Sequence, residues 1–245
     1  MSFDIDIVKT VRSAGSQGSK REFTLKVRFL TRSKRSVIFG PSGAGKTLTL
    51  QAIAGLLTPD RGRIVCDTDV LFDHSAHIDI PARTRRLGYL FQDYALFPKL
   101  NVRQNIAFGL QTGWRNPARH TDGDAVDYWL DAFELEEVAS QLPHELSGGQ
   151  RQRTALARAL APGPRALLLD EPFSALDPGL RARMRSELDE LLKRVDIPIL
   201  MITHDPEDLQ WFGDNAFFMR DGSIEQDHTR PDLPTPGPIQ QKESR

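Results

Sequence analysis

A glycine-rich segment followed by a lysine constrains the fold of this chain more than any other feature. Residues 40–47 read Gly-Pro-Ser-Gly-Ala-Gly-Lys-Thr, which fits the pattern G-x-x-x-x-G-K-[ST]. The segment follows a short apolar run, residues 36–39, and precedes a helical pattern over residues 46–57. In that context glycines let successive backbone N–H groups point at phosphate oxygens, and the helix adds its positive N-terminal end. The segment therefore predicts a phosphate-binding loop in an α/β fold.

Two side chains of this loop have separate expected tasks. Lys46 is expected to reach the β- and γ-phosphates of a nucleotide, and the Thr47 hydroxyl is expected to hold Mg²⁺. The candidate nucleotide-binding residues of the loop are Gly40, Pro41, Ser42, Gly43, Ala44, Gly45, Lys46 and Thr47.

Hydrophobic patterning predicts the elements around the loop. Residues 23–29 alternate apolar and polar side chains, as in a half-buried strand. Residues 166–169 and 197–202 are continuous apolar runs, typical of strands buried on both faces of a parallel sheet. Helical spacing occurs over 124–133 and again after Asp177-Pro178, a cap followed by a first-turn proline. The fold class is therefore α/β, with a P-loop NTPase core, a mostly parallel sheet, an antiparallel β-subdomain near the N-terminus and a helical subdomain.

Two adjacent carboxylates follow the apolar run 166–169. Ligands of open α/β sheets bind at the carboxyl ends of the strands, where Asp170 and Glu171 are expected to lie. Asp170 is the candidate to hold magnesium. Glu171 is the candidate to polarise a water that attacks the γ-phosphate.

A second anion-binding pattern lies about a hundred residues after the loop. Ser147 and Gln150 form an S-x-x-Q capping box at the start of a helix, and Gly148 and Gly149 expose backbone N–H groups. One nucleotide already held by the phosphate loop has little room for this segment of the same chain. A well-capped helix with no ligand is the alternative.

Together these residues resemble the nucleotide-binding subunit of ABC transporters over residues 36–223, with Leu146 to Gln150 as the signature sequence. Three more motifs occur in the family's order. Gln92 matches the Q-loop glutamine that touches magnesium, Asp177 ends the D-loop that begins at Ser174, and His204 matches the switch histidine that contacts the γ-phosphate. The resemblance implies ATP as ligand and ATPase activity. It also implies a homodimer in which ATP on one phosphate loop is closed by the partner's signature sequence.

Composition bounds the domain organisation and the location. The 245 residues carry a net charge of −1 and one cysteine, Cys66, and no apolar run approaches membrane-spanning length. We expect one ABC ATPase domain at residues 1–225, whose helical subdomain covers about 95–160. A Pro-rich, disordered tail is expected at 226–245, with no C-terminal regulatory domain. The expected location is peripheral, on the cytoplasmic face of the inner membrane.

The expected cargo and partners are inferred from similarity to one branch of the family. Residues 88–98 and 101–106 look like importer subunits of the molybdate, sulfate, iron and sugar branch, which makes molybdate the first candidate. Permease subunits and a solute-binding protein are then the expected partners, and no nucleic acid is expected. An exporter ATPase, an importer ATPase for another cargo and a soluble ABC ATPase acting on nucleic acid are the alternatives. Residues 94–100 either receive a permease coupling helix or pack the helical subdomain.

Two groups of side chains allow alternative interpretations. Phe23 is either an adenine platform or a core residue of its strand. The basic cluster Arg83, Arg85 and Arg86 is expected to be a solvated turn, and contact with phosphate or with an acidic side chain of a permease is the alternative.

Overall fold

One large mixed sheet organises the molecule. The computed structural model describes residues 2–14, 20–110, 116–119, 121, 123–174 and 176–229. Within these ranges, eleven strands hydrogen-bond in the order β6-β5-β4-β1-β2-β11-β10-β3-β9-β8-β7. None of the helices in these ranges has the length and apolarity that crossing a bilayer requires.

The sheet has an antiparallel part and a parallel part. The antiparallel part holds β1 (Phe3–Ala14), β2 (Lys20–Thr31), β4 (Arg61–Cys66), β5 (Asp69–Asp73) and β6 (Ile78–Asp79). The parallel part holds β3 (Arg35–Phe39), β7 (Leu87–Leu90), β8 (Ala166–Asp170), β9 (Ile199–Thr203) and β10 (Asn215–Arg220). The last strand, β11 (Ser223–Thr229), runs antiparallel to β10 and joins the parts through the pairing of Ser223 with Lys26.

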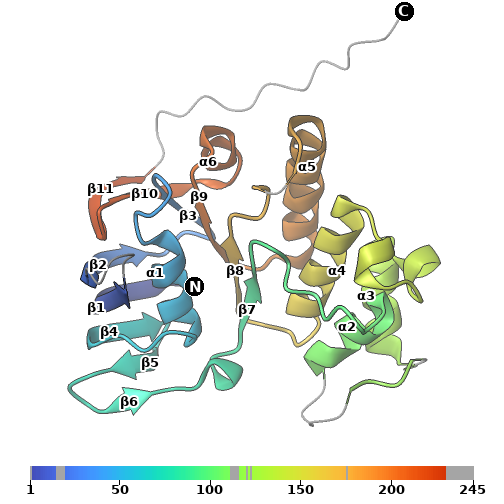
Figure 1. Cartoon of the computed structure of the whole chain (residues 1–245), viewed down its shortest axis with the longest axis horizontal. Coiled ribbons are helices and arrows are strands. Elements are labelled where there is room, and N and C mark those ends of the chain that lie inside the picture. Colours follow the sequence, from blue (N-terminus) through green and yellow to red (C-terminus); the bar gives the residue numbers. More distant parts are fainter. Residues whose placement is uncertain are drawn as a thin grey trace, which may run out of the picture.

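Helices cover both faces of the parallel strands (Figure 1). They are α1 (Lys46–Ala54), α2 (Val102–Leu110), α3 (Asp124–Ala132), α4 (Gly148–Leu160), α5 (Pro178–Val195) and α6 (Pro206–Phe212). Single 3-10 turns lie at Ala82–Thr84, Glu136–Val138 and Pro143–Glu145. Figure 1 shows α2, α3 and α4 grouped together beyond β7, at the opposite end of the molecule from β1 and β2.

Two hydrophobic cores divide the side chains of the central strands. Leu168 packs in the core that includes Leu50 of α1, whereas Leu167 and Leu169 pack in the core of α4, α5 and α6. Successive side chains of a strand point to opposite faces, so a run with helices on both sides must be apolar throughout. The continuous runs at β8 and β9 were predicted for this reason, and all five residues of each strand are buried.

Helix α1 ends earlier than the expected residue 57, and the reason lies far along the chain. Gly55 caps the helix at Ala54 in a left-handed conformation with φ 80°. A Cβ at Gly55 would lie 2.5 Å from Nε of Arg85, whose guanidinium donates to the carbonyls of Ala52 and Ile53 at 2.9 Å. The expectation that Arg85 belongs to a solvated turn is therefore wrong, because its fully buried side chain caps the carboxyl end of α1.

The C-terminal strand extends past the expected start of the tail. Residues 226–229 belong to β11 and pair with β10, so the expectation of disorder from residue 226 is wrong for these four positions. Ladder hydrogen bonds to a neighbouring strand do not require apolar periodicity, the signal that the sequence lacks here. Residues 230–245 lie outside the described part of the chain, as do residues 15–19 between β1 and β2.

Candidate nucleotide-binding site

The glycine-rich loop lies between β3 and α1 and turns its lysine inward. Gly43 and Gly45 adopt φ values of 81° and 101°, in the left-handed region that favours glycine. Lys46 Nζ donates to the carbonyl oxygens of Gly40 at 2.8 Å and Pro41 at 3.0 Å. The lysine side chain is only 4% exposed, which holds its ammonium group over the loop. The loop is thus shaped as a cradle with a fixed positive charge.

The first carboxylate of β8 contacts α1 and β7. Asp170 accepts hydrogen bonds from the Thr47 hydroxyl at 3.1 Å and from the Tyr89 hydroxyl at 2.9 Å. Burial raises the pKa of Asp170 above its ordinary value, although both hydrogen bonds act in the opposite direction. A buried carboxylate whose ionisation is costly gains from a nearby cation. A hydroxyl and a carboxylate are oxygen ligands that suit Mg²⁺, which also keeps water and phosphate ligands.

The second carboxylate lies between a lysine and a histidine. Glu171 Oε1 is 3.3 Å from Lys46 Nζ, and Glu171 Oε2 is 2.9 Å from His204 Nδ1. Glu171 has φ 44°, a left-handed conformation that is uncommon for a residue with a side chain and is often found at functional sites. Its backbone N–H donates to the Ile202 carbonyl at 3.0 Å, which ties the end of β8 to β9.

A cavity of about 380 Å³, here called the P-loop cavity, opens beside these groups. Its volume falls in the usual range for small-molecule sites. Ser42, Gly43, Gly45, Lys46, Thr47, Leu48, Gln92 and Glu171 line one part of it, and Val11 and Phe23 line the rest. Phe23 is half-buried in this wall rather than fully in the core, which favours the adenine-platform alternative. Val11 was not identified from the sequence, because it comes from the other strand of the N-terminal hairpin.

The predicted signature sequence lies elsewhere. The capping box is confirmed. The backbone N–H of Gln150 donates to Ser147 Oγ at 3.2 Å, and the backbone N–H of Ser147 donates to Gln150 Oε1 at 2.8 Å. Asp177 is likewise confirmed as the cap of α5 through the Leu180 N–H at 3.0 Å. Among the described residues that line the P-loop cavity, none belongs to 146–150.

The N-termini of α4 and α5 lie next to each other. A Cβ on Gly148 would lie 3.4 Å from Leu176 and 3.5 Å from Leu180. Ser147 and Asp177 are exposed. We call the surface of Ser147, Gly148 and Asp177 the signature face. Ala175, in the expected D-loop, lies outside the described residues.

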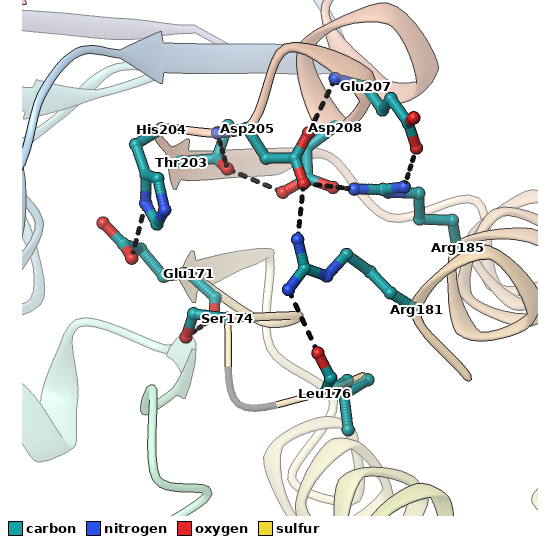
Figure 2. A network of polar contacts seen from close by, with 10 residues as sticks. All are labelled: Glu171, Ser174, Leu176, Arg181, Arg185, Thr203, His204, Asp205, Glu207 and Asp208. Carbon is teal, nitrogen blue, oxygen red and sulfur yellow. Dashed lines mark hydrogen bonds and ion pairs between the residues drawn. The ribbon is translucent and has the colours of Figure 1, made fainter. Parts of the chain in front are cut away.

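Sequence reasoning missed a polar network behind His204 (Figure 2). Arg185 of α5 donates to Asp208 at 2.6 Å and to Asp205 at 2.6 Å, and it also pairs with Glu207. Arg181, one turn earlier, donates to the same Asp205 oxygen at 2.9 Å. Burial favours a raised pKa at Asp205, but the Glu207 amide and the two guanidinium groups hold that pKa below its ordinary value.

The signals for these missed residues were present but ambiguous. Arginines four residues apart on α5 fall on one helix face, yet such pairs are most often solvated. The acidic run 205–208 alone indicates only a capped helix start. Tyr89, the partner of Asp170, gives no sequence signal for that contact.

Comparisons with known proteins agree with this geometry. The sequence profile described as ABC transporter matches residues 27–174. The Fe(3+) ions import ATP-binding protein of Pseudomonas fluorescens is 50% identical over 193 residues, which are 78% of this chain and 52% of that protein. The sulfate/thiosulfate import ATP-binding protein of Synechocystis sp. is 45% identical over 193 residues, 79% of this chain and 52% of that protein. The chain thus spans about half the length of the curated relatives it matches.

A solved structure supports the fold. A dimeric structure of a bacterial ABC transporter cassette has a TM-score of 0.73 and 27% identity, covering 94% of this chain and 98% of that one. A post-hydrolysis state of the same cassette with ADP and phosphate has a TM-score of 0.71 and 28% identity, with the same coverage. The predicted fold class, an α/β P-loop core with a mostly parallel sheet, an antiparallel N-terminal β-subdomain and a helical subdomain, is confirmed, and the parallel and antiparallel strands form one mixed sheet.

Proposed function

This chain belongs to the ABC transporter family, and on that premise we propose that it binds ATP with Mg²⁺ and hydrolyses it to drive a membrane importer. The observation that carries the proposal is the position of Glu171 at the P-loop cavity, between Lys46 Nζ at 3.3 Å and His204 Nδ1 at 2.9 Å. A carboxylate beside a phosphate cradle, with a histidine on its other side, suits activation of water.

Each part of the cavity has a proposed role. The loop residues 40–47 bind the phosphates through backbone N–H groups, and Lys46 contacts the β- and γ-phosphates. Thr47, Asp170 and Gln92 hold Mg²⁺, which when bound supplies positive charge to the phosphate oxygens. Phe23 and Val11 offer the apolar end of the cavity to adenine.

Hydrolysis requires one proton transfer and one bond exchange. Glu171 accepts a proton from water as the water oxygen forms a bond to the γ-phosphorus, and the bond from that phosphorus to the bridging oxygen of ADP breaks. His204 is exposed on one side, at 48%, and contacts Glu171 on the other. It can therefore orient the carboxylate and contact the γ-phosphate at once.

We propose that two copies complete each site. The signature face lies outside the P-loop cavity, and its exposed serine and adjacent glycine N–H groups suit the γ-phosphate of a nucleotide on a second copy. Asp177 lies on the same face. The similar cassette solved as a dimer supports this arrangement. Release of phosphate would remove the shared contact, so that the copies separate.

The membrane partner and cargo extend the proposal. Phe97 and Phe108 are each 36% exposed with ring centroids 4.2 Å apart, an apolar surface suited to a permease helix. The protein would then be peripheral on the cytoplasmic face of the inner membrane, in a complex with a solute-binding protein. The ATPase domain would extend through the end of β11 at Thr229, with about 95–160 as the helical subdomain.

Molybdate or a related oxyanion remains the proposed cargo, on the sequence of 88–106. The relatives described above are named for iron or sulfate/thiosulfate import, and a spermidine/putrescine import ATP-binding protein of Shigella flexneri is 44% identical over 196 residues. Their names support import. Uptake of molybdate, sulfate, Fe³⁺ and spermidine into vesicles that hold the whole complex would decide the cargo.

The purified chain tests the core of the proposal. We expect Mg²⁺-dependent release of phosphate from ATP, with a specific activity that rises with protein concentration because dimers form the sites. A triphosphate analogue that cannot be cleaved should release no phosphate under the same conditions. Equal specific activity at all concentrations, with a monomeric mass throughout, would contradict the dimeric site.

A further inference from the structure

One arginine donates hydrogen bonds to both of the loops that carry Glu171 and His204. The loop from β8 to α5 follows Glu171, and the loop from β9 to α6 contains His204 and Asp205. Arg181 of α5 donates one guanidinium N–H to Asp205 Oδ2 at 2.9 Å and another to the Leu176 carbonyl at 3.0 Å. Figure 2 shows this side chain between the two loops.

On the basis of the function proposed above, we propose that Arg181 is a positioning residue that fixes the His204 loop relative to the Glu171 loop. The guanidinium is planar and its donors form a rigid fork, so two acceptors held by it have a fixed separation. One acceptor is next to His204 and the other next to Asp177 of the signature face. The contact of the signature face with a second copy is thus tied to the geometry of the Glu171–His204 pair.

Arg185, one turn further along α5, differs from Arg181 in the loops to which it donates hydrogen bonds. Arg185 is fully buried, lies 5.8 Å from the Phe173 ring, and pairs with three acids of the same loop, Asp205, Glu207 and Asp208. All of its acids belong to residues 205–208, and it meets the Glu171 loop through the Phe173 ring, with no hydrogen bond to that loop among the described residues. Arg181 donates hydrogen bonds to both loops, and its removal leaves the Phe173 ring contact and the Glu171–His204 contact between them.

Rigid contacts continue from Arg181 to the reacting groups. Asp205 accepts from the Glu207 N–H at 2.9 Å, and its own N–H donates to Thr203 Oγ1 at 3.0 Å, which fixes the backbone on both sides of His204. On the other loop, the Ser174 hydroxyl donates to the Glu171 carbonyl at 2.9 Å. A cavity of about 30 Å³ lies between these contacts, lined by residues that include Glu171, Arg181, His204 and Asp205. Loss of the guanidinium would enlarge that cavity beside Glu171.

Three variants test the inference. Arg181→Met keeps the length of the side chain but removes both hydrogen bonds. Arg181→Lys restores a charge that can reach one acceptor at a time. The matched control is Arg183→Met, two residues along α5, because Arg183 is 74% exposed and its ion pair within the described part of the chain is with Glu187, one turn away.

We expect Arg181→Met to lower kcat by about 10-fold to 100-fold, the cost of displacing a reacting group by about 1 Å, while KM for ATP changes less than about threefold. Arg181→Lys should recover part of the loss, and Arg183→Met should match the wild type. A rise in KM with unchanged kcat would overturn the inference, since Arg181 would then affect binding only.

Hydrogen exchange supplies a readout that needs no hydrolysis. In Arg181→Met, the amides of residues 173, 174, 176 and 177 and those of 203–205 and 207–209 should exchange faster together, while those of 46–54 keep the wild-type rate. Faster exchange in only one of the two loops, or in neither, would overturn the inference. Lack of ATP hydrolysis by the wild type would instead contradict the proposed function, and the exchange result would still decide whether Arg181 joins the loops.

Discussion

The P-loop cavity and the signature face differ in how their polar groups are satisfied. Beside the cavity, Lys46 and His204 each contact Glu171, and the three residues come from separate segments of the chain. On the signature face, the hydrogen bonds described for Ser147 and for the Asp177 side chain lie within the first turn of their own helices. The cavity is therefore assembled by the tertiary fold, whereas the signature face is complete locally and exposed. This difference supports the proposal that each site is divided between two copies.

The largest expected effect tests the cavity. Glu171→Gln removes the proton acceptor but keeps the shape of the side chain, so ATP binding should persist while kcat falls by about 100-fold to 10,000-fold. Steady-state phosphate release and binding of labelled ATP measure the two quantities. The control is Glu190→Gln, which makes the same change at an exposed carboxylate on α5. Near-normal turnover in Glu171→Gln would mean that another group accepts the proton.

A smaller effect is expected from charge on the signature face. Aspartate and asparagine both cap helices well, so Ser147→Asp and Ser147→Asn should leave α4 intact. Only the aspartate places a negative charge against the phosphates of a second copy. Ser147→Asp should therefore hydrolyse ATP at least about tenfold more slowly than Ser147→Asn and should dimerise less with ATP.

Binding of ATP to the separated protomer sharpens this test. Because the signature face lies outside the P-loop cavity, both Ser147 variants should bind ATP with wild-type affinity as monomers. Analytical ultracentrifugation with labelled ATP measures affinity and assembly together. Loss of monomer affinity in Ser147→Asp alone would show that the segment serves its own cavity.

Removal of the Tyr89 hydroxyl should have a more limited effect, confined to the cavity. Tyr89→Phe deletes the donor to Asp170, and loss of such a partner typically weakens metal binding by about tenfold or more. The Mg²⁺ concentration for half-maximal ATPase activity should rise, with dimerisation unchanged at saturating Mg²⁺. Tyr128→Phe, at an exposed position, is the matched control. An equal shift of this Mg²⁺ concentration in Tyr89→Phe and Tyr128→Phe would contradict a specific role of the Tyr89 hydroxyl.

The smallest expected effect concerns the reactivity of the Cys66 thiol, which tests whether every variant keeps the sheet intact. Burial raises the pKa of Cys66 from 9.0 to about 11, so at pH 8 its thiolate fraction is about 100-fold below that of a free thiol. A thiol reagent should react at the same slow rate in all variants. The folded state binds this proton more tightly than the unfolded state, so stability should fall as the pH rises from 9 to 11. A fast-reacting thiol in one variant would identify a disturbed fold.

Much of the cavity was predictable because its motifs are local. The loop 40–47, the acids after β8 and the capping box at Ser147 are each defined by residues within a few positions of one another. Phe23 remained undecided, since the pattern of β2 cannot say whether a side chain near its end lines a core or a cavity. Arg85 was misassigned because three basic residues within four positions look alike in sequence, and only the packing of α1 against one of them buries it.

The sequence by itself determined the phosphate loop, the strands buried on both faces and the caps of α4 and α5, because these depend on backbone geometry and side-chain periodicity over short distances. Only the tertiary structure decided which groups meet: Lys46 and His204 on either side of Glu171, Tyr89 on Asp170, and Arg181 between two loops. Such contacts join residues up to 125 positions apart, as Lys46 and Glu171 are. Their partners are selected by the order of the strands in the sheet, which no local pattern specifies.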